Sequence, residues 1–132
     1  MSGIIGIAGA RMRRLMIVVT TLDTEKSAAI AAVFNRAKAA AVEYNVEVIL
    51  TGESGVIATI HAVESVFDEE YLRLLYNSIR SAKAAGVKIS ICERSIEWCS
   101  LNNTELIPEI DNVVSSQYII QQAAPDTYVA YL

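Results

Sequence analysis

The sequence has few of the residues that mark secreted or disordered proteins. Its 132 residues include two cysteines and two prolines. Two cysteines are too few for a disulfide-scaffolded secreted domain, and a chain with 53% hydrophobic residues is not a disordered polymer. No run approaches the roughly 18 to 20 consecutive apolar residues that a membrane-spanning helix needs. We therefore expect a cytoplasmic protein of one globular domain that does not enter a membrane.

Metal and nucleotide motifs are also missing. His61 is the only histidine, and it forms no ligand pair at the close spacing of zinc sites with Cys92 or Cys99. The segment TGESG at 51–55 contains glycines that could approach a phosphate, but Glu53 places negative charge there and no lysine follows. We expect no metal and no cofactor, and a flavodoxin-like nucleotide binder is the least favoured class.

Basic charge is concentrated near the start of the chain. The net charge is −4, and Arg11, Arg13 and Arg14 stand in a stretch without acids, so the rest of the chain carries 8 basic and 15 acidic residues. An acidic body does not support nucleic-acid binding. We interpret the arginines as a solvated lead-in to the first strand. Residues 1–13 are then an N-terminal arm, and 14–132 the single domain.

The chain is unusually apolar for its size. Its mean hydropathy is +0.36. A small domain has a large surface for its volume, so one monomer cannot easily bury this much apolar sequence. We expect part of it to lie in a subunit interface, which predicts a homo-oligomer.

Aliphatic runs and helical periodicity alternate along the chain. Aliphatic or alternating runs predict strands at 15–19, 46–50, 87–92, 112–115 and 127–132. Apolar spacing predicts helices over 25–43, 56–66, 68–85, 95–101 and 116–124. Thr24 and Asp68 are expected to cap two of these helices, and Gly86 to end the one at 68–85. Strands that alternate with helices favour an α/β fold, a three-layer α/β/α sandwich with a mostly parallel five-stranded sheet.

Functional groups in such sheets gather at the carboxyl ends of the strands. Cys92 stands at one of these ends, just before the short helix for which Ser95 is the predicted cap. Backbone N–H groups at a helix start, and the guanidinium of Arg94, favour a thiolate there. The alternative is a small apolar residue that closes the strand, because free cysteines are commonly buried.

Several phrases of the sequence resemble the DsrE/DsrF-like sulfur-relay family. They are RLMIVVTT before an alanine-rich helix, VEVILTGESGV, AAGVKISICERS with its cysteine at a strand end, ELIPEIDNVVS, and the tyrosine-bearing TYVAYL. The resemblance covers residues 13 to 132. It implies a flavodoxin-like sandwich that assembles as a homotrimer or hexamer.

The resemblance also implies a function for Cys92, which would carry sulfur as a persulfide between a donor and an acceptor protein. Many relatives have a small residue or Gly-Thr-Cys after the cysteine, whereas this chain has Glu93 and Arg94. A carboxylate beside the thiol opposes its ionisation. Whether the chain is a sulfurtransferase-type enzyme stays open. The alternative function is a binding or assembly module of the same fold without thiol chemistry.

Other residues near this strand end complete the candidate site. Arg94 and Ser95 are expected to stabilise the thiolate, and Thr21, Gly52 and Trp98 to form a pocket. Trp98 either covers this pocket or inserts into a neighbouring subunit. Cys99 is expected to be a buried thiol rather than a redox partner of Cys92, and His61 a packed residue rather than a base.

Overall fold

The computed structural model describes residues 13–20, 28–59, 69–98, 106–123 and 125–132. They form one five-stranded sheet in the order β5-β4-β3-β2-β6, and every neighbouring pair is parallel. The strands are β2 (Arg13–Val19), β3 (Tyr44–Leu50), β4 (Lys88–Cys92), β5 (Asn112–Val114) and β6 (Thr127–Tyr131). The α/β fold class is confirmed, and the sheet is wholly parallel.

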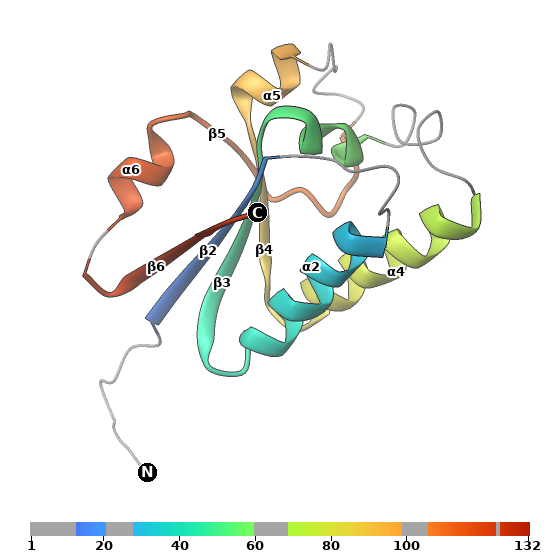
Figure 1. Cartoon of the computed structure of the whole chain (residues 1–132), viewed down its shortest axis with the longest axis horizontal. Coiled ribbons are helices and arrows are strands. Elements are labelled where there is room, and N and C mark those ends of the chain that lie inside the picture. Colours follow the sequence, from blue (N-terminus) through green and yellow to red (C-terminus); the bar gives the residue numbers. More distant parts are fainter. Residues whose placement is uncertain (1–12, 21–27, 60–68, 99–105, 124) are drawn as a thin grey trace.

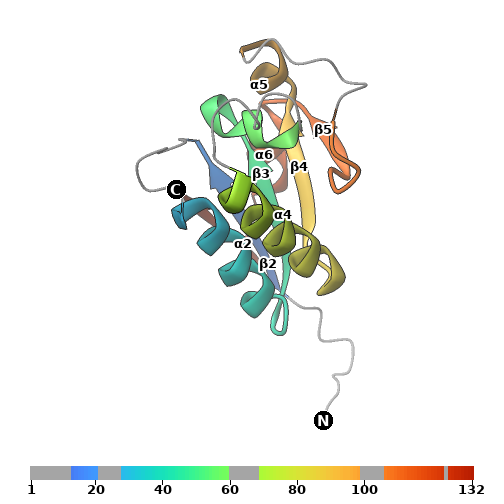
Figure 2. The same cartoon turned by 90° about the vertical axis from the view of Figure 1, so that its right-hand side faces the viewer.

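Helices cover both faces of the sheet, but unequally. Figures 1 and 2 show α2 (Ala28–Ala40) and α4 (Glu69–Ala84) side by side on one face, and α6 (Tyr118–Gln122) on the other. The 3₁₀ helix η1 (Gly52–Ala58) and α5 (Glu93–Trp98) lie together at the carboxyl ends of the central strands.

The main core lies between the sheet and the pair α2 and α4. Phe34 of α2, Leu75 of α4 and Val48 of β3 are at most 1% exposed there. A smaller apolar cluster on the opposite face contains Met16 and Ile49, against which residues of α6 pack. Alternate residues of a strand point to opposite faces, so β3 has to be apolar on both sides. Its near-continuous aliphatic run follows from this position.

The strand predictions are confirmed with small shifts at their ends. The predicted capping position of Gly86 is also confirmed, because its φ of 97° is one that glycine adopts without strain. The caps expected from residues 24 and 68 lie outside the described residues.

The helix predicted at 56–66 is wrong in its described part. A 3₁₀ helix instead begins at Gly52 and ends at Ala58, and Thr59 then forms an antiparallel bridge with Leu106. The buried hydroxyl of Ser54 tightens the turn, since it accepts a hydrogen bond from the Thr51 N–H and donates to the carbonyl of Val19. β-Branched residues such as Val56 also weaken the preference for an α-helix.

The prediction that Arg13 and Arg14 are a solvated lead-in to the first strand is wrong, whereas Arg11 lies outside the described residues. Arg13 and Arg14 are the first residues of β2. The guanidinium of Arg13 contacts the ring and hydroxyl of Tyr128, and that of Arg14 pairs with Glu47 of β3. Both cations therefore belong to the sheet, where they contact the strands on either side of β2.

Candidate functional site

Cys92 is the last residue of β4, and α5 begins at the next residue. Its side chain is 6% exposed and belongs to neither apolar cluster among the described residues. Ile89 and Ile91 pack in the main core, so alternation directs Cys92 to the face that α6 covers. Val114 of β5 lies directly opposite it in the register. The thiol thus stands at a carboxyl strand end, close to the surface.

Ser95 does not cap α5, because the helix begins at Glu93. Its hydroxyl donates a hydrogen bond of 2.6 Å to the carbonyl oxygen of Gly52, and the residue is 1% exposed. A hydroxyl has one proton to donate. This proton is used in the bond that joins α5 to η1.

Arg94 is exposed beside an open hollow of about 530 Å³. The hollow is lined by α5 and by the edge strand, through the residues Glu93, Arg94, Ile96, Glu97 and Val113. Two carboxylates flank the one guanidinium in this lining. Two residues of this lining are close to Cys92 in sequence or register. Glu93 follows Cys92 in the chain, and Val113 precedes Val114, the residue opposite Cys92.

Gly52 has a structural reason to be glycine. Its φ is 54°, and a Cβ there would lie 3.0 Å from the carbonyl oxygen of Thr20. Gly52 contacts α5 through Ser95, which places it near the candidate site but in a packed turn. Thr21, His61 and Cys99 lie outside the described residues, and so does the side chain of Trp98.

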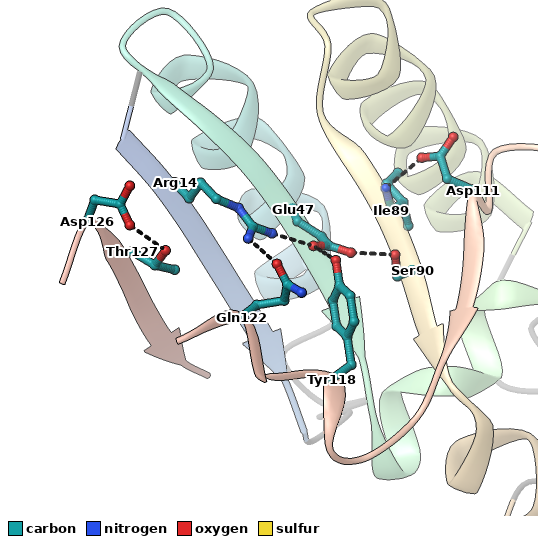
Figure 3. A network of polar contacts seen from close by, with 9 residues as sticks. All are labelled: Arg14, Glu47, Ile89, Ser90, Asp111, Tyr118, Gln122, Asp126 and Thr127. Atoms are coloured by element: carbon teal, nitrogen blue, oxygen red, sulfur yellow. Dashed lines mark hydrogen bonds and ion pairs between the residues drawn. The ribbon is translucent and has the colours of Figure 1, made fainter. Parts of the chain in front are cut away.

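A buried polar network on the α6 face was not expected from the sequence (Figure 3). Glu47 is 3% exposed in the central strand. It accepts a hydrogen bond of 2.7 Å from the hydroxyl of Ser90 and one of 2.9 Å from that of Tyr118. A nitrogen of Arg14 lies 3.5 Å from its Oε1, and Arg14 also donates to the amide oxygen of Gln122. Three donors, from β2, β4 and α6, thus surround one carboxylate.

This network connects α6 to the sheet. Tyr118 and Gln122 are the first and last residues of α6, and the side chains of both form hydrogen bonds within the network. The available signal was the charge of Glu47 between Val46 and Val48, inside a strand of the predicted three-layer sandwich. A buried carboxylate has to be paired or hydrogen-bonded.

A second polar cluster lies at the opposite end of β4. Asp111 accepts hydrogen bonds from Lys83 at 2.5 Å and from the N–H of Ile89 at 2.8 Å. Burial alone would raise the pKa of Asp111, but the hydrogen bonds from Lys83 and Ile89, with the charges of Lys83 and Lys88, lower it below its ordinary value. This cluster fixes the start of β4 and is separate from the Cys92 end.

The described residues lack two further kinds of feature. There, no group of three or more histidine, cysteine, aspartate or glutamate side chains could hold a metal ion. The helices found in that part of the chain also include none with the length and apolar character needed to span a membrane.

The chain resembles solved structures of the same fold. Neither a family model nor a curated protein matches it. A protein of unknown function, MTH1491 from Methanobacterium thermoautotrophicum, aligns with a TM-score of 0.67 at 13% identity, over 91% of this chain and 99% of its own. The ychN protein from E. coli aligns with a TM-score of 0.66 at 10% identity, over 92% and 100%. These likenesses establish the fold alone.

Proposed function

We propose that this chain is a DsrE-like sulfur carrier that holds sulfane sulfur as a persulfide on Cys92. The observation that carries the proposal is the position of Cys92, at the carboxyl end of β4 and immediately before α5. Binding groups of parallel α/β sheets gather at this edge. The resemblance of AAGVKISICERS to the sulfur-relay family supports the same residue.

The surroundings of Cys92 suit exchange with another protein. The residue is 6% exposed, and the next residue along the chain, Glu93, lines an open hollow. The guanidinium of Arg94 is the cation in that hollow and supports an anionic sulfur species nearby. A partner that presents its own thiol or persulfide can approach from this side.

The transfer needs no external oxidant. The thiolate of Cys92 attacks the outer sulfur of a donor persulfide, R–S–SH. A sulfur–sulfur bond forms on Cys92 while the bond within the donor breaks. The donor leaves as a thiolate and takes up the proton that the Cys92 thiol released, so one thiol and one persulfide become one persulfide and one thiol. The same exchange in reverse delivers the sulfur to an acceptor.

A second candidate function is a binding or assembly module in which Cys92 is inert. The burial of the Cys92 side chain favours it, since a structural buried cysteine is unreactive. This function predicts slow alkylation of Cys92 at neutral pH and unchanged partner binding by Cys92→Ser.

Mass spectrometry after incubation with glutathione persulfide separates the two functions. The sulfur carrier gains about 32 Da, the mass of one sulfur atom, on the peptide that contains Cys92. Cys92→Ser abolishes the adduct, whereas Cys99→Ser, the matched control, keeps it. An unmodified wild-type protein, or an adduct that persists in Cys92→Ser, contradicts the proposal. The pH dependence of alkylation in Cys99→Ser then reports how readily Cys92 ionises.

A further inference from the structure

The two edges of the sheet differ in how well they are protected. β5 is an edge strand of three residues, and the charged Asp111 precedes it. β6 is an edge strand of five residues, TYVAY, without a charged side chain or a proline. Natural proteins usually protect a long edge with lysine, proline, a bulge or a cover. Figure 1 shows β6 as the outer strand beside β2, and no other described strand pairs with it.

The backbone of β6 has a defined set of outward-facing groups. The N–H of Leu132 donates to Val18, and its carbonyl accepts from Thr20, so both groups of Leu132 point toward β2. The carbonyl of Asp126 also points there, because it accepts from Arg14. Successive residues of a strand direct these groups to opposite edges. Thr127, Val129 and Tyr131 therefore present their N–H and C=O groups outward.

This pattern is self-complementary. We propose that β6 pairs antiparallel with β6 of a second copy of this chain, about a two-fold axis at Val129, so that two sheets join into one. In this register Val129 lies opposite Val129 of the copy, and Thr127 opposite Tyr131. All three are pairs of the hydrogen-bonded type, in which each pair exchanges two hydrogen bonds. A two-fold axis at Ala130 would leave Thr127 without an opposite residue in β6.

The side chains of β6 also favour a second copy as the occupant. β6 carries no charge, so two identical strands meet without like charges facing each other. Tyr131 is 65% exposed and Tyr128 is 46% exposed, which leaves aromatic surface on both faces of this edge. Cross-strand contacts of aromatic residues stabilise antiparallel pairs. The proposal does not depend on the chemistry of Cys92.

Charge substitutions test the register. Thr127→Lys combined with Tyr131→Lys brings lysines opposite each other across the axis, and sedimentation velocity is expected to show an assembly of half the wild-type mass. Thr127→Glu combined with Tyr131→Lys is the matched control. It places opposite charges in the same pairs and is expected to keep the wild-type mass. Circular dichroism checks that both variants fold.

Hydrogen exchange on the unmodified protein gives an independent readout. The N–H of Val129 points outward, so it is protected only when a second strand covers it, whereas that of Ala130 faces β2 in either case. We expect protection at both residues. Three results would each overturn the proposal: a monomeric wild-type protein, an equal mass for the like-charge variant and the wild type, or free exchange at Val129. If the true occupant is a strand of a different protein, the purified chain is monomeric and Val129 exchanges freely.

Discussion

The hydroxyl of Ser95 donates to the carbonyl oxygen of Gly52 at 2.6 Å, and this bond joins the helix that follows Cys92 to the turn that follows β3. Both residues come from the candidate site predicted from the sequence. Their contact makes them parts of the packing that holds α5 in place.

Loss of this bond should destabilise the fold measurably. Ser95→Ala is expected to lower the free energy of unfolding by about 1 to 2 kcal/mol, because Ser95 is buried and its hydrogen bond is lost. Ser116→Ala, at an exposed serine, supplies the control and should change stability by less than about 0.5 kcal/mol. Urea unfolding measures both. Equal stabilities of the two variants would contradict the role of the Ser95 bond.

Gly55 should be intolerant of a side chain for a related reason. A Cβ at Gly55 would lie 1.8 Å from the Oγ of Ser95 and 3.3 Å from Cδ1 of Ile91. Gly55→Ala is therefore expected to be more destabilising than Ser95→Ala. In a Ser95→Gly background the Oγ and Cβ atoms of Ser95 are absent, so Gly55→Ala should lower the free energy of unfolding by less. A double-mutant cycle measures the coupling, and strict additivity would argue against this contact.

The Glu47 network should contribute to stability through α6. Tyr118→Phe removes one hydrogen bond to a buried carboxylate and is expected to cost about 1.5 to 3 kcal/mol. Glu47→Gln should cost more, since an amide offers one oxygen where Ser90 and Tyr118 each donate to a separate one. Gln121→Ala, at an exposed position of the same helix, is the control and should be near neutral. A neutral Tyr118→Phe would show that α6 is held by other contacts.

Access to Cys92 should depend on its neighbour in β5. Val114 lies opposite Cys92 and is 8% exposed, so Val114→Ala opens space beside the thiol. We expect alkylation of Cys92 by iodoacetamide to become several-fold faster, in a Cys99→Ser background. Val113→Ala is the control. Val113 precedes Val114, is exposed and points to the other face of the sheet, so its substitution should leave the alkylation rate unchanged. Equal rates in both variants would mean that Cys92 is reached from another side.

Asp111 should make the free energy of unfolding depend on pH in the acidic range. Its pKa is lowered in the folded chain, so the stabilisation is present above the ordinary value of 3.8 and is lost as the pH falls below it. Asp111→Asn is expected to reduce stability at neutral pH and to flatten this acid-induced loss. Asp126→Asn, at an exposed carboxylate, is the control. Thermal unfolding between neutral and acidic pH tests this, and identical acid profiles of Asp111→Asn and the wild type would contradict it.

The sheet was predictable because its inner strands, β2, β3 and β4, are largely buried on both faces. A run such as VEVIL in β3 has few alternatives to a central parallel strand, and the α/β alternation then gives the layers. The strand order was not predictable, since nothing local to β6 indicates that it pairs with β2. That pairing depends on contacts between distant segments, such as Arg13 with Tyr128.

The candidate site was only partly predictable. Cys92 lies at the strand end that its sequence context indicated, but Ser95 was assigned as a cap because serine is a common capping residue. Its bond to Gly52 requires η1, whose 3₁₀ geometry was not visible in the sequence. Glu47 was predicted only as part of a strand and not as a site residue, although its neighbours Val46 and Val48 are apolar. The partners that make its burial tolerable come from β2, β4 and α6, far apart in the sequence.

The pairing of β6 with β2 has a consequence for biosynthesis. β2 is the first described strand to leave the ribosome, yet the neighbour on one of its sides is the last. Until translation has passed Tyr131, that side of β2 has no partner among the described strands of its own nascent chain. A chaperone that shields such a segment would therefore be needed longest by the part of the polypeptide that was made first.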